Sequence, residues 1–139
     1  MARKTTSQIE QAIYDALELF FEGKISGMLY KSGCRPLDSR LEDAVISVGS
    51  TSAEQIQTGR AKLNIYVSDI DNNSGSLVPD KERLTEFSLL TEDVLKILNE
   101  SDTDYLFDLS GATETIAEPD INQHFVNINL EFDCITFNK

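Results

Sequence analysis

The chain has 139 residues, which is the size of one domain, and its 40% apolar and 26% charged residues are ordinary for a globular fold. The net charge of -12 is unevenly placed: residues 1–68 hold 8 acidic and 8 basic residues, whereas residues 69–139 hold 16 and 4. Nucleic acids are bound through Lys and Arg, so this balance argues against general phosphate binding, and we expect no sequence-specific nucleic-acid binding. No apolar run is long enough to span a membrane, and nothing after Met1 has the pattern of a signal peptide, so we expect an intracellular product.

The first elements in chain order are a helix and two short strands. Ser7 and Glu10 have the spacing of a capping box, and the apolar residues behind them recur at helical spacing, which predicts a helix over 7–22. β-type runs predict short strands over 27–31 and 42–48, separated by a loop.

The rest of the chain predicts a long strand, a second helix and two closing strands. Strict alternation over 55–68 predicts a strand with one polar face, followed by a polar loop over 69–79. Helical spacing continues over 80–99, and a strand is predicted over 104–109, with a long loop over 110–121 that we expect to be functional or mobile. The last run alternates, and its inward residues are predicted to be Val126, Ile128, Leu130, Phe132 and Cys134.

The predicted order is therefore α-β-β-β-α-β-β. Neither a helix nor a sheet can bury its apolar side alone, so two helices should cover one face of a mainly antiparallel sheet. We predict an α+β fold in a single domain over 1–139, because no repeat and no linker divides the chain.

One local motif is typical of calcium sites. Asp69, Asp71, Asn73 and Asp80 occupy positions 1, 3, 5 and 12 of an EF-hand-like loop, where oxygen ligands are needed. Position 6 is Ser74 where glycine is expected, and position 12 lacks the usual glutamate. The alternative is a polar connection whose Asp and Asn side chains form turns, with Asp80 capping the next helix.

Catalytic signatures are absent from the sequence. His124, the only histidine, has no nucleophile or orienting partner that the sequence reveals. Cys34 and Cys134 lie 100 positions apart with no CxxC pair, so both are expected to be free thiols. There is no GxSxG, phosphate-loop or GxGxxG motif. We therefore expect no enzyme activity, no cofactor and no metal.

The start of the long predicted strand is unusually polar. Gln55, Gln57 and Arg60 surround Gly59, which suggests a bulge or a close backbone approach. Two interpretations stay open here: an exposed hairpin end, or a strand tip that contacts a neighbouring subunit.

The whole layout resembles a family of small phage proteins. Gly27-Met28-Leu29-Tyr30 follows the first helix as a G-x-x-Y strand, and Arg35-Pro36 comes next. With the strands at 45–48 and 63–67 and the helix at 80–99, this order is similar to the bacteriophage tail completion proteins of the tail terminator and neck group. The sequences of residues 55–59 and 64–69 also resemble those of proteins from Bacteroides-type phages and integrated elements.

This resemblance implies a structural protein rather than an enzyme. It would form a homo-oligomeric ring at the head-tail junction, contact tail tube and head-side connector proteins, and need no cofactor. Such a protein would assemble in the host cytoplasm and then become part of the virion, and its acidic half could line a channel through which DNA slides without sticking. The alternatives are an acidic protein-binding module, either a DNA mimic or a regulator of a basic partner, and a small calcium-binding domain.

Overall fold

Two long strands form the centre of the molecule. β3 (Ile56–Ser68) and β8 (Gln123–Ile135) pair antiparallel along their full length, from Ile56 opposite Ile135 to Ser68 opposite Gln123. The computed structural model describes residues 5–50, 56–101 and 104–135. Because side chains alternate along a strand, the residues predicted as inward share one buried face, namely Ala61, Leu63, Ile65 and Val67 of β3 and Val126, Ile128, Leu130, Phe132 and Cys134 of β8.

Four shorter strands complete the six-stranded sheet around this pair. β2 (Ala44–Ser50) pairs antiparallel with β3, and β1 (Leu29–Lys31) pairs parallel with β2. On the other side, β6 (Tyr105–Leu109) and β7 (Glu114–Glu118) follow one another along the free edge of β8. The described sheet order is β1-β2-β3-β8-β6, with β7 also on β8.

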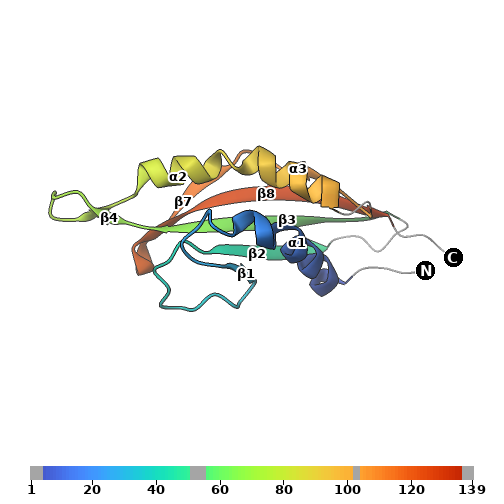
Figure 1. The fold of residues 1–139 in the computed structure, drawn as a ribbon, viewed down its shortest axis with the longest axis horizontal. Helices are drawn as coiled ribbons and strands as arrows, with labels where there is room; N and C mark the ends of the chain where they lie inside the picture. Colours follow the sequence, from blue (N-terminus) through green and yellow to red (C-terminus); the bar gives the residue numbers. More distant parts are fainter. Residues whose placement is uncertain (1–4, 51–55, 102–103, 136–139) are drawn as a thin grey trace.

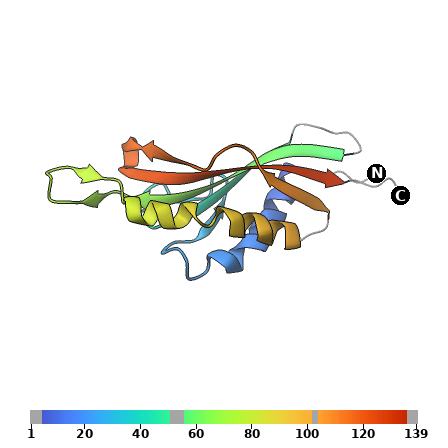
Figure 2. The same ribbon diagram turned by 90° about the horizontal axis from the view of Figure 1, so that it is seen from above.

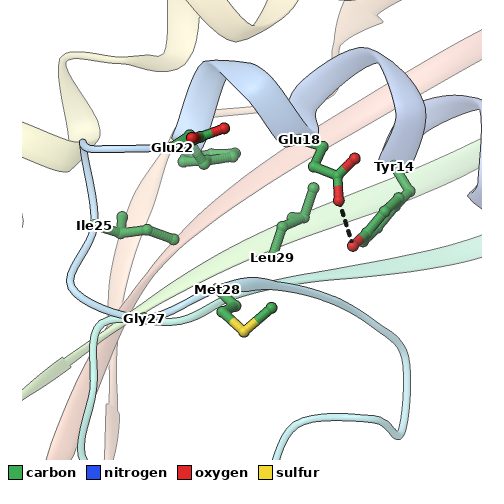
Figure 3. A pocket seen from close by; sticks show the side chains of 8 residues that line it. Tyr14, Glu18, Glu22, Ile25, Gly27, Met28 and Leu29 are labelled. Atoms are coloured by element: carbon green, nitrogen blue, oxygen red, sulfur yellow. Dashed lines mark hydrogen bonds between the residues drawn. The ribbon is translucent and has the colours of Figure 1, made fainter.

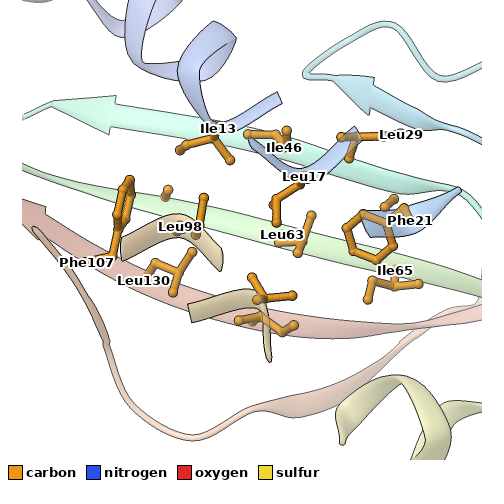
Figure 4. Close-up of a cluster of buried hydrophobic side chains, with 14 of the residues drawn as sticks. Ile13, Leu17, Phe21, Leu29, Ile46, Leu63, Ile65, Leu98, Phe107 and Leu130 are labelled. Atoms are coloured by element: carbon orange, nitrogen blue, oxygen red, sulfur yellow. The ribbon is translucent and has the colours of Figure 1, made fainter. Parts of the chain in front are cut away.

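Among the described residues, three α-helices form a second layer on the apolar face of the sheet (Figures 1 and 2). α1 (Thr6–Phe21) lies over β1 and β2, and α2 (Lys81–Ser88) and α3 (Thr91–Ser101) lie over β8 and β6. The two layers enclose one apolar core, which includes Ile13, Leu17, Phe21, Ile46, Leu63, Ile65, Leu98, Phe107 and Leu130 (Figure 4). The predicted α+β class and the mainly antiparallel sheet are confirmed.

The first helix begins differently from its prediction. Its N-cap is Thr5, whose hydroxyl accepts a hydrogen bond from the Gln8 backbone, and the Gln8 side chain accepts one from the Thr5 backbone. The predicted box of Ser7 and Glu10 is therefore wrong, because the same spacing occurs two residues earlier. Ser7 lies inside the first turn.

The second half contains more elements than predicted. The predicted helix 80–99 is two helices, α2 and α3, because the chain turns at Leu89 and Leu90. The predicted loop 69–79 contains β4 (Ile70–Asp71) and β5 (Leu77–Val78), which pair as a separate hairpin. Most of the predicted loop 110–121 is β7 and a short 3-10 helix, η1 (Pro119–Ile121).

The cysteines and the helix lengths bear on two further expectations. Cys34 and Cys134 are both thiols, Cys34 at the surface and Cys134 in the core, as expected. Within the described ranges, no helix has the length and apolarity that crossing a membrane requires.

Candidate functional site

The hairpin between β3 and α2 extends away from the body of the molecule, and we call residues 69–80 the arm (Figures 1 and 2). β4 and β5 pair only with each other, Ile70 opposite Val78 and Asp71 opposite Leu77. The tip turns through positive φ at Asn73 (66°) and Gly75 (91°). Ile70 and Leu77 are 43% and 47% exposed, so the arm presents apolar side chains to solvent.

The base of the arm is fixed to the sheet. The Asp69 carboxylate lies 2.7 Å from Nδ1 of His124, and the Asp69 backbone N–H donates to the Asn122 carbonyl at 2.9 Å. The hydroxyl of Ser68 donates to the Arg40 carbonyl at 2.8 Å. The structure thus gives His124 an orienting partner that the sequence did not reveal, since the two residues meet only through the β3–β8 register.

The residues of the EF-hand-like pattern serve separate turns and caps. Asp71 accepts a hydrogen bond from the Asn73 backbone at 2.8 Å, and Asp80 accepts one from the Arg83 backbone at 3.2 Å at the start of α2. Asp69 is engaged by His124. Across the residues that the structure describes, no three His, Cys, Asp or Glu side chains gather as a metal site. The arrangement matches the alternative prediction, a polar connection whose Asp side chains form turns and in which Asp80 caps the next helix.

The residues of the predicted subunit-contact strand do not share one surface. Gln57 is buried, 5% exposed, on the helix-covered side of the sheet, whereas Arg60 is exposed on the opposite side. Gln55 lies outside the described residues. At Arg60 the backbone of β3 is paired on both sides, with Gly49 of β2 and Glu131 of β8. Contact with a subunit stays a prediction for the exposed Arg60 side chain.

Gly59 allows a close approach rather than a bulge. The register of β3 with both neighbours runs through it without an extra residue. A Cβ at this position would lie 2.6 Å from the Gly49 carbonyl oxygen and 2.6 Å from the Phe132 ring. Phe132 therefore occupies the space that a side chain here would need.

We call the sheet face opposite the helices the outer face, and its charges are segregated. The β3 part carries Arg60 and Lys62, which are both exposed. The part formed by β6, β7 and β8 carries only acidic charges, namely Asp108, Glu114, Glu118, Glu131 and Asp133. An open groove of about 500 Å³ crosses this boundary beside Arg60 and Glu131.

The acidic second half of the chain does not form a single face. Besides the acidic strands, the helix layer exposes its own carboxylates on α2 and α3, namely Glu82, Glu86, Glu92, Asp93 and Glu100. Acidic side chains thus lie on both layers of the described molecule. A channel lined by the whole acidic half would need both layers to face it.

A buried ion pair fastens the connection between β1 and β2, which we call the latch (residues 32–43). Arg35 Nε donates to the Asp43 carboxylate at 2.8 Å, and their side chains are 11% and 0% exposed. Arg35 also stacks 4.1 Å from the Tyr66 ring centre and donates to the Gln123 side chain at 2.9 Å. Burial raises the pKa of the Tyr66 hydroxyl, and the nearby Arg35 charge opposes this shift.

The motif residues Gly27 and Arg35 both meet at Asp43. A Cβ on Gly27 would lie 1.9 Å from Oδ1 of Asp43, and the Met28 backbone N–H donates to that same oxygen at 3.0 Å. The glycine of the G-x-x-Y pattern and the arginine of the Arg-Pro pattern are thus explained by how the latch packs. Sequence reasoning missed Asp43 because it gave no reason to connect these distant positions.

Asn99, which sequence reasoning also did not single out, closes the edge of β6. Its side-chain amide accepts from the Phe107 backbone N–H at 2.7 Å and donates to the Phe107 carbonyl at 3.0 Å. The amide thereby occupies the positions that a neighbouring strand would use. No common sequence motif marks such a pairing.

A small hollow of about 210 Å³ lies between α1 and the segment that enters β1 (Figure 3). Tyr14 donates a hydrogen bond to Glu18 at 2.9 Å, which raises the pKa of the Tyr14 hydroxyl because the carboxylate holds its proton. Glu22 and the exposed Met28 also border the hollow. The rest of the lining is mainly apolar and includes Phe21, Ile25 and Leu29.

Comparison with known proteins supports the fold alone. No protein-family model matches the chain, and no curated protein matches it. A solved structure identified only by a sequence number is similar, with a TM-score of 0.50 and 12% identity, and the match covers 99% of this chain and 100% of that one. At this identity the likeness concerns architecture and says nothing about activity.

Proposed function

We propose that this protein is a structural, non-catalytic component of a phage or prophage tail, of the tail completion and terminator type. Copies of the chain would assemble into a ring at the head-tail junction. The proposed partners are the tail tube and head-side connector proteins. Assembly would take place in the host cytoplasm, and the ring would then remain in the virion.

The observation that carries this proposal is the arm. An isolated two-stranded hairpin is marginally stable in water, and this one holds Ile70 and Leu77 about half exposed beyond the body of the molecule. Such a segment gains stability when another protein covers it. The α+β architecture, with an N-terminal helix on a mainly antiparallel sheet, is also compatible with the family that the sequence resembles.

The experiment is to measure the assembly of the purified protein. Light scattering and negative-stain microscopy would be carried out with and without the tail tube protein of the same phage or prophage. We expect closed rings, either of the protein alone or on the ends of tubes. A strict monomer that ignores the tube at high concentration would overturn the proposal.

A second candidate function is binding of a basic protein on the acidic part of the outer face. The observation that favours it is the groove beside Arg60, where Asp108, Glu131 and Asp133 face solvent. Calorimetric titration with a lysine-rich peptide would test it. Glu131→Lys should abolish binding, whereas Glu92→Lys on the helix layer makes the same charge change and should preserve it. Equal loss of peptide binding in both variants would show that net charge alone attracts the peptide, and not this part of the outer face.

A further inference from the structure

One edge of the sheet is open and uncharged. The Ala44 backbone N–H donates to the Met28 carbonyl on the β1 side, and backbone groups alternate, so the N–H of Val48 points toward the same side. β1 ends at Lys31, opposite Ile46, so within the described residues no strand lies beside Val48. β2 therefore presents main-chain donors and acceptors there.

The edges of β6 and β7 are less receptive. The edge of β6 is occupied at Phe107 by the Asn99 amide. The edge of β7 carries Glu114 and Glu118, and charged side chains on an edge strand discourage pairing with another chain. Of these edges, the one along β2 is the most available for strand addition.

The arm and this open edge lie at opposite ends of β3. The arm follows Ser68 at the C-terminal end of β3, whereas Ser50, at the end of β2, pairs with Gly59 near its beginning. Figure 1 shows the hairpin at one end of the long axis of the molecule. A contact between two surfaces at opposite ends joins copies head to tail, and such contacts form a ring where the rotation between neighbouring copies closes.

The charges of the two surfaces are complementary. Residues 69–80 contain three aspartates and no Lys or Arg. In β3, Lys62 pairs with Ser47 and Arg60 with Gly49, one strand from the open edge. A Cβ at Gly49 would meet no atom within 4 Å, so the space between Arg60 and the edge is open to an incoming carboxylate.

We propose that the arm of one copy adds to the open edge of β2 in the next copy. Main-chain hydrogen bonds would join a strand of the arm to the edge at Val48, and Asp71 would lie toward Arg60 and Lys62. This is strand addition between copies of one chain, with pairing supplying the affinity and charge the specificity. The inference rests on the proposed ring assembly and identifies its interface.

Two variants test the contact from its two sides. In the first, Asn-Gly replaces residues 71–77, which shortens the arm and leaves the β2 edge intact. In the second, Val48→Pro removes the outward N–H, a change that edge strands tolerate, and leaves the arm intact. Each variant alone should be monomeric, and a mixture should form a 1:1 dimer, because only one arm–edge pair remains. Val48→Thr is the matched control and should assemble like the wild type.

A charge exchange tests the same contact without altering the backbone. Arg60→Glu should weaken assembly by about tenfold or more, and Asp71→Lys in the same chain should restore it. Sedimentation measures assembly, and circular dichroism checks folding. Assembly of the arm-shortened and Arg60→Glu variants at wild-type strength would overturn this inference alone. A wild-type protein that stays monomeric and does not bind tubes would overturn the proposed function as well.

Discussion

The latch and the arm are both polar connections of similar length, and they behave in opposite ways. The latch is held to the sheet by the buried Arg35–Asp43 pair, the Tyr66 ring and the Gln123 side chain. Beyond Asp69, the hydrogen bonds of the arm tip run within the arm itself, as from the Asn73 backbone to Asp71. Aspartate content therefore does not distinguish the two connections. The difference lies in whether the carboxylate meets a buried cation or its own backbone.

The largest expected effect comes from removing the carboxylate of the latch. Asp43→Ala leaves the Arg35 guanidinium buried without its partner, which should lower the free energy of unfolding by about 3–5 kcal/mol. Asp71→Ala makes the same change in the arm and should cost no more than about 0.5 kcal/mol. Urea unfolding measures both. Equal losses would show that the two connections are not held differently.

The next effect concerns the close packing at the latch. Gly27→Ala would place a methyl group 1.9 Å from Oδ1 of Asp43, and the shift needed to relieve this clash should cost about 1–3 kcal/mol. Gly49→Ala is the control, because its methyl group would enter open space. Thermal unfolding of both variants would check the difference. A fully stable Gly27→Ala protein would contradict the geometry of the latch.

A smaller effect is expected where a side chain closes an edge. Asn99→Ala removes both hydrogen bonds to the Phe107 backbone, for a loss of about 1–2 kcal/mol. Hydrogen exchange at the Phe107 amide should accelerate. Asn99→Asp keeps the acceptor and loses the donor, so it should fall between the wild type and Asn99→Ala. Unchanged exchange in Asn99→Ala would mean that the amide does not protect this edge.

The smallest effect lies on the surface of α1, outside both connections. The carboxylate of Glu18 raises the pKa of Tyr14, so the folded protein holds this proton more tightly than the unfolded chain does. The resulting stabilisation is present below the ordinary tyrosine pKa of about 10 and is lost as the pH rises through the raised value. Glu18→Gln should lower the pKa of Tyr14 in a spectrophotometric titration, with Tyr14→Phe identifying its signal. An unchanged titration would show that the bond is absent in solution.

The periodic parts of the fold could be predicted because one face of each is buried. The alternation along β3 and β8 identified the inward residues, from Ala61 to Val67 and from Val126 to Cys134. The break between α2 and α3 could not be predicted, because the turn at Leu89 keeps a helical backbone conformation and the apolar spacing continues through it. Leu89 itself is 74% exposed.

The missed strands and contacts have no periodic signal in the sequence. β7 has no buried residue and so no apolar period, and its strand character comes from pairing with β8. β4 and β5 are two residues each, too short to show a period. Likewise, the Asp43, His124 and Asn99 contacts follow from the fold and not from local spacing. The candidate surfaces were therefore less predictable than the core.

Strand β8 has a consequence for how the chain reaches this structure. It pairs with β3, β6 and β7, and it is the last of these strands in chain order. Even its nearest pairing to β3, Gln123 with Ser68, spans the arm, two helices and two strands. Non-local pairing of this kind slows folding, and an unpaired strand edge favours aggregation. During synthesis β3 cannot pair with β8 until β8 has been made, after β6 and β7. Loss of β8 would leave β3, β6 and β7 each with an unpaired edge.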